Sequence, residues 1–137
     1  MIPNNFTSKS QEAIQVAQML ANENGQQAVD PIHLLASLIN QDAGIIPSLL
    51  QKMKINVNRL ISQVDQILQS LPKNFGFNQS GMGQVLLSPA LAKTMQNSAN
   101  QAKQFGDDFI STEHLFLALL QNKQVAQFLT GQGIEVK

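Results

Sequence analysis

A chain of 137 residues, 43% of them apolar and 13% charged, is long enough for one domain with a substantial core. Nine basic residues balance nine acidic ones without a basic run, and cysteine is absent, so the sequence gives no sign of a nucleic-acid surface, a disulfide framework or a cysteine-based catalytic or zinc site. Because residues 1–6 lack the features of a signal peptide and the longest apolar run, 115–120, is too short to cross a bilayer, we expect a soluble cytoplasmic domain without membrane contact.

Two stretches of the chain predict the same first helix. Thr7 and Ser88, 81 residues apart, are both good N-cap residues, and each precedes apolar residues at helical spacing. Gly25 and Gly106 follow at the same offset and predict where these helices end. We expect the stripes of both copies to be buried: Ala13, Ile14, Ala17, Leu20 and Ala21, and then Leu91, Met95, Ala99 and Ala102.

A second, more apolar helix also occurs twice, within residues 30–39 and 111–120. Each copy begins with an N-cap residue, Asp30 or Ser111, and carries a histidine at the third helical position. The apolar face recurs in both copies, and we expect four of its residues to be buried where the two halves meet: Leu34, Leu38, Leu115 and Leu119.

Smaller helices are expected after each of these. One lies around Leu49, and its counterpart lies at residues 125–129. The first copy then has a fourth helix with seven apolar residues between positions 57 and 71. The counterpart of this helix would begin after residues 134–136, so we expect that the natural chain continues and that the last helix is missing here. No stretch shows the two-residue alternation of a β-strand.

The sequence thus predicts an all-α fold for a single domain over residues 1–137. It consists of two pseudo-twofold related units of four helices, at residues 6–71 and 87–137. Residues 72–86, rich in Gly, Asn and Gln and without periodicity, form the predicted connector. We expect residues 6–58 to superpose on the second unit.

The sequence shows no catalytic constellation. His33 and His114 could be brought together as a metal pair, but two imidazoles alone do not make a site, and local hydrogen bonding is the favoured explanation for each ring. Asp107 and Asp108 could serve acid–base chemistry, although such a pair more often lies in a solvated loop. Aromatic residues in expected loops could anchor a partner, or could fold back onto the domain: Phe75, Phe77 and Phe109.

The chain resembles the double Clp N-terminal repeat in three stretches: Phe6-Thr7 with Glu12-Ala13 and Ala17, His33-Leu34-Leu35, and the run from Gly106 to Leu120. The end of the fourth helix, Leu71-Pro72-Lys73, and the glycine-rich connector are most similar to those of ClpB-type disaggregases. This resemblance implies an eight-helix, non-catalytic domain without a cofactor of its own, ahead of two ATPase modules that use ATP and Mg in a hexamer. Its partners would be unfolded or aggregated polypeptides and, through the parent protein, an Hsp70-type chaperone, with no nucleic acid and no membrane.

The resemblance also implies substrate-binding residues at Thr7, Asp107 and Glu113. From the residues alone, Thr7 caps a helix and Glu113 favours the positive end of a helix dipole. Asp107 precedes the cap at Ser111 and is expected to have no capping role, which makes it the best test of a binding surface. The family also has an apolar groove near the helix that starts at residue 88, and this chain departs from that pattern by two polar residues, Asn97 and Gln101.

Two other functions compete with this one. The first is the N-terminal domain of a ClpA- or ClpC-type unfoldase, which binds adaptors or modified substrates and feeds a protease. The second is a stand-alone enzyme, which the missing catalytic constellation disfavours.

Overall fold

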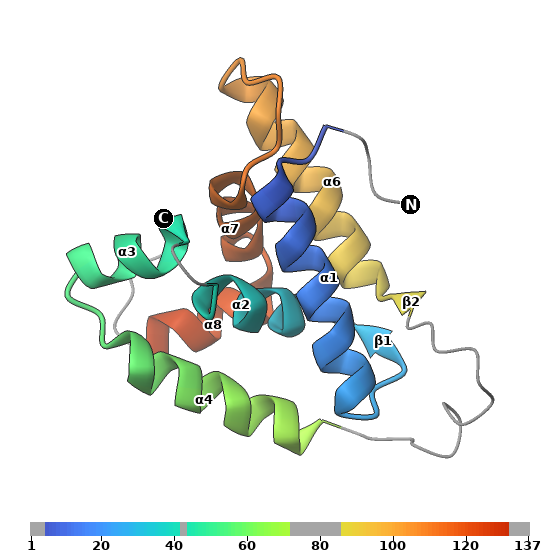
Figure 1. Ribbon diagram of the computed structural model, residues 1–137, viewed down its shortest axis with the longest axis vertical. Coiled ribbons are helices and arrows are strands. Elements are labelled where there is room, and N and C mark those ends of the chain that lie inside the picture. Colours follow the sequence, from blue (N-terminus) through green and yellow to red (C-terminus); the bar gives the residue numbers. More distant parts are fainter. Residues whose placement is uncertain (1–4, 42–43, 72–85, 132–137) are drawn as a thin grey trace.

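The computed structural model describes residues 5–41, 44–71 and 86–131. Within these residues the chain forms seven helices and two very short strands (Figure 1), which are α1 Ser8–Glu23, β1 Ala28–Val29, α2 Pro31–Ile39, α3 Ile45–Lys52, α4 Val57–Ser70, β2 Leu86–Leu87, α6 Pro89–Gln104, α7 Thr112–Leu120 and α8 Lys123–Gly131. The predicted helical fold is therefore confirmed. The expected turn at residues 134–136, the two phenylalanines Phe75 and Phe77, and nearly all of the expected connector lie outside the described residues.

The ends of the two longest helices follow the predicted signals. Thr7 Oγ1 accepts a hydrogen bond from the Ser10 N–H at 3.2 Å, and Ser88 Oγ accepts one from the Leu91 N–H at 3.1 Å. Gly25 and Gly106 follow these helices with φ of 71° and 72°, the left-handed conformation in which other residues are strained. Caps and stops thus recur at the same offset of 81 residues.

Helices α2 and α7 form the centre of the domain. α2 contacts α1, α3, α4, α6 and α7, and α4 lies across it (Figure 1). The four predicted core leucines are at most 1% exposed, and α2 and α7 touch each other, so these side chains are buried between the two halves as predicted. In the part of the chain that the structure describes, no helix is both long and apolar enough to cross a membrane.

Short strands were not predicted, and they link the two halves. Residues 28–29 pair in parallel with residues 86–87, and Phe6 forms an isolated parallel bridge with Ile110. A strand of two residues is too short to show an alternating pattern, which is why the sequence gave no sign of it. Position 86, expected in the connector, instead begins β2. Because 6 pairs with 110 and 87 pairs with 29, each half supplies the partner of the other half's leading residue.

Candidate functional site

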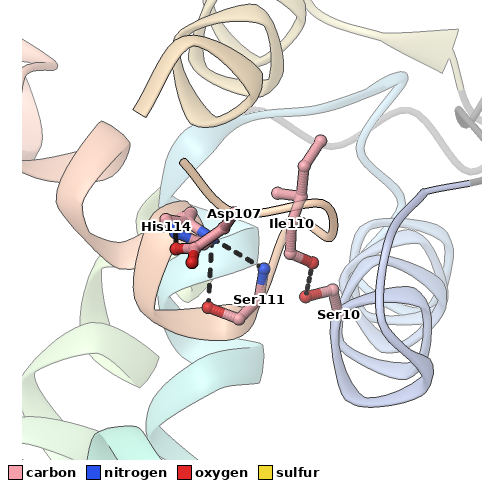
Figure 2. Close-up of polar contacts among 5 residues, drawn as sticks. All are labelled: Ser10, Asp107, Ile110, Ser111 and His114. Carbon is pink, nitrogen blue, oxygen red and sulfur yellow. Dashed lines mark hydrogen bonds and ion pairs between the residues drawn. The ribbon is translucent and has the colours of Figure 1, made fainter. Parts of the chain in front are cut away.

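Thr7 is both a helix cap and part of a link between α1 and the loop before α7. Its Oγ1 donates a hydrogen bond to Ser10 Oγ at 2.9 Å, and Ser10 Oγ in turn donates to the carbonyl of Ile110 at 2.8 Å (Figure 2). The Thr7 N–H donates to the same carbonyl at 3.0 Å. Ser10 is fully buried, so this chain of bonds is shielded from water. The predicted capping role of Thr7 is confirmed.

Asp107 has a structural role that the sequence analysis denied it. His114 Nε2 lies 2.9 Å from Asp107 Oδ2, and His114 Nδ1 accepts a hydrogen bond from the Ser111 N–H at 2.9 Å (Figure 2). His114 occupies the N3 position of α7, where a capping box ordinarily carries Glu or Gln. Because Asp107 holds the ring that caps α7, the expectation that it has no capping role was wrong. The prediction failed because histidine is an uncommon residue at that position.

The first half contains the same arrangement with a neutral partner. His33 Nδ1 accepts from the Asp30 N–H at 2.9 Å, and His33 Nε2 lies 3.1 Å from Gln26 Oε1. Gln26 stands 81 residues before Asp107, but it is 4% exposed, whereas the Asp107 side chain is 51% exposed. The favoured explanation for both histidines, local hydrogen bonding, is confirmed. Among the described residues, no group of three or more His, Asp or Glu side chains is placed to hold a metal ion.

The buried His33 ring should make the domain less stable in acid. Burial lowers the pKa of His33 from its ordinary value of 6.5, and nearby Asp30 only partly opposes this. Below that value the unfolded chain takes up a proton that the folded chain resists, so stability is full above it and is lost as the pH falls through it. We expect a lower free energy of unfolding by urea at about pH 5 than at about pH 7.5.

A His33→Gln variant provides the control for this pH dependence. Glutamine suits the N3 position of a capping box and does not titrate. The loss of stability on acidification should therefore be smaller in this variant. An equal loss in both proteins would mean that other groups cause it.

Two exposed aromatic side chains flank Asp107. Phe105, the C-cap residue of α6, is 61% exposed, and Phe109 is 60% exposed. The Phe105 ring lies 6.0 Å from the His114 ring. The sequence analysis named Phe109, which does not fold back onto the domain, but it missed Phe105 because that residue ends a helix. Glu113 is exposed in the first turn of α7, as predicted.

The structure gathers the three predicted site residues around one loop, residues 105–111. Asp107 lies in this loop, and Glu113 follows it in α7. Thr7 reaches the loop through its bond to Ile110. This region therefore combines two exposed phenyl rings with exposed acidic groups and a backbone that is fixed on both sides.

A separate hollow of about 520 Å³ lies between α2, α4 and α8. It is lined by Asp30, Pro31, Ile32, Ile67, Leu71, Asn122, Gln124, Val125 and Phe128. None of the three predicted site residues belongs to it. The groove that the resemblance implies lies elsewhere, near α6, where Asn97 and Gln101 are half-buried.

Residues 5–132 match the family of the Clp repeat (R) N-terminal domain. The chain belongs to this family. It is 36% identical over 135 residues to the chaperone protein ClpB of Bacteroides thetaiotaomicron, and the matched region covers 98% of this chain. The chain spans only 15% of the length of that relative. This Clp N-terminal domain is thus homologous to the N-terminal region of ClpB.

Solved structures of other Clp N-terminal domains share this fold. The Hsp104 N-terminal domain from Candida albicans matches with a TM-score of 0.85 and 19% identity, covering 97% of this chain and 85% of that one. A complex of the ClpV N-domain with a VipB peptide matches with a TM-score of 0.74 and 17% identity, covering 97% of this chain and 79% of that one. At this identity the likeness concerns the fold alone.

Proposed function

We propose that this Clp N-terminal domain captures exposed apolar segments of unfolded or aggregated polypeptides for a ClpB-type disaggregase. The observation that carries the proposal is the pair of exposed phenyl rings, Phe105 and Phe109, on the loop that also holds Asp107. Homology to ClpB supports it, as does the ClpV N-domain that binds a VipB peptide. The domain itself has no catalytic role and no cofactor.

The parent protein supplies the remaining activities in this proposal. ATPase modules that use ATP and Mg form a hexamer, and an Hsp70-type chaperone delivers aggregates to it in the cytoplasm. The partner is polypeptide, and neither nucleic acid nor membrane takes part. Homology to ClpB, at 36% identity, favours this over a ClpA- or ClpC-type unfoldase.

The site suits weak capture that tolerates many sequences. Exposed phenyl rings gain free energy when an apolar side chain covers them, and this gain requires no particular partner sequence. The surrounding loop is held in place, so binding does not have to order it. Several such domains on one hexamer would raise the overall affinity for an aggregate without any tight single contact.

Removing both phenyl rings should weaken capture. We expect the double variant Phe105→Ala with Phe109→Ala to bind an unfolded protein about tenfold more weakly, because two exposed aromatic contacts are lost together. Both side chains are largely solvent-exposed, so the fold should be kept. Fluorescence anisotropy with labelled, reduced and carboxymethylated α-lactalbumin, which stays unfolded, measures the affinity.

A Leu86→Ala variant is the matched control. Leu86 is 74% exposed, and it lies at the opposite end of α6 from Phe105. This variant should bind as the unmodified chain does. If the double variant also binds normally, or if the control weakens binding equally, capture does not take place at the loop.

A further inference from the structure

We infer that Asp107 is a positioning residue for the proposed binding site. It holds His114, which fixes the loop that presents Phe105 and Phe109, and its negative charge does not contact the captured segment. The inference rests on the proposed function for the identity of the ligand. It changes the role of a residue that the resemblance assigns to substrate binding.

The hydrogen bonds to His114 define the state of the ring. Its Nδ1 accepts from the Ser111 N–H at 2.9 Å, so the ring proton of the neutral form is on Nε2. Nε2 therefore donates to Asp107 Oδ2 at 2.9 Å. Asp107 thereby selects the tautomer whose Nδ1 caps α7, as outer partners of histidine commonly do.

The other half of the domain performs the same task without a charge. Gln26 accepts from His33 Nε2, and His33 Nδ1 accepts from a backbone N–H. The backbones also agree, because the N–H of Gln26 and the N–H of Asp107 each donate to a helix carbonyl five residues earlier, at 2.9 Å. Each residue follows a glycine with positive φ. An amide oxygen at position 107 should therefore hold the ring as the carboxylate does.

The loop is fixed at both ends. At one end Asp107 is bonded to His114, and at the other the carbonyl of Ile110 accepts from Ser10 Oγ at 2.8 Å (Figure 2). Phe109 lies between these two points, and Phe105 lies two residues before the first. Loss of the bond from Asp107 would free the stretch that carries both phenyl rings while leaving the Ile110 end attached.

The test compares three substitutions in the 137-residue chain. Asp107→Ala removes the acceptor, and Asp107→Gln copies Gln26 and keeps an acceptor without the charge. Asp108→Asn is the matched control for loss of a negative charge, because Asp108 is exposed and its side chain makes no hydrogen bond among the described residues. The readouts are amide exchange at Ser111 by NMR and affinity for carboxymethylated α-lactalbumin.

We expect Asp107→Ala to speed Ser111 exchange about tenfold and to weaken binding about fivefold. Asp107→Gln should return both values to within about twofold of the unmodified chain, and Asp108→Asn should change neither. If Asp107→Gln keeps exchange slow but binds as weakly as Asp107→Ala, the charge itself contacts the ligand and the inference is wrong.

Further outcomes separate the inference from the proposed function. Unchanged exchange in Asp107→Ala would also overturn the inference. If Asp107→Gln fails to slow exchange, Asp107→Asn, which matches aspartate in size, repeats the test, and failure of both amides counts against positioning. If the unmodified chain does not bind the unfolded protein, the proposed function fails, while Ser111 exchange still decides whether Asp107 positions the loop.

Discussion

Replacing Leu115 with alanine should lower the free energy of unfolding by about 2–5 kcal/mol. Leu115 is fully buried on α7, which contacts α1, α2, α3, α6 and α8. The change removes buried apolar surface and leaves a cavity that these neighbours can fill only in part. Since a domain is typically stable by about 5–15 kcal/mol, this one substitution should remove a large share of the total. Chemical denaturation followed by circular dichroism measures it.

Leu117→Ala is the matched control for this experiment. Leu117 lies on the same helix and loses the same atoms, but it is 37% exposed. We expect a loss below about 1 kcal/mol, since the cost of truncation depends on burial. Similar losses for Leu115→Ala and Leu117→Ala would show that α7 is not the central helix.

Replacing His33 with alanine should cost more stability than the same change at His114. Loss of the His33 ring leaves the buried Gln26 amide and the Asp30 N–H without their partners, and each such group costs about 1–3 kcal/mol. Loss of the His114 ring leaves the Asp107 carboxylate, which is half-exposed and can bond to water instead. We expect about 3 kcal/mol for His33→Ala and at least about 1 kcal/mol less for His114→Ala.

Urea denaturation of both alanine variants at neutral pH tests this comparison. At that pH both rings are expected to be neutral in the folded chain, so the difference reports on the groups left behind. Equal losses, or a larger loss for His114→Ala, would contradict the argument that burial of the partner decides the cost.

The sequence predicted most of the helices because their signals are local. Thr7, Ser88 and Gly106 are residues whose chemistry marks a helix end, and the apolar stripes between such ends show which face is buried. The offset of 81 residues supplied further evidence, since an ambiguous cap in one half could be compared with a clear one in the other. The two strands escaped prediction because their bonds join residues that are distant in the sequence.

The site was predicted less well than the fold. Glu113 and Thr7 lie where the caps placed them, but the bond from Asp107 to His114 was missed. A signal for it was present, because Gln26 and Asp107 each stand seven residues before a histidine at the same offset. Hydrogen-bond partners depend on how a loop folds back on its helix, and residue spacing alone does not specify that.

The exchange of partners between the two halves also constrains the order of events during synthesis on the ribosome. Ser10 of α1 bonds to the carbonyl of Ile110, a hundred residues later in the chain. The start of α1 therefore leaves the ribosome long before its partner, and the first half cannot form these bonds on its own. Closing so long a loop costs chain entropy that only the completed core repays. The native arrangement is thus reached late in translation, and until then the emerging first half depends on its own helices alone.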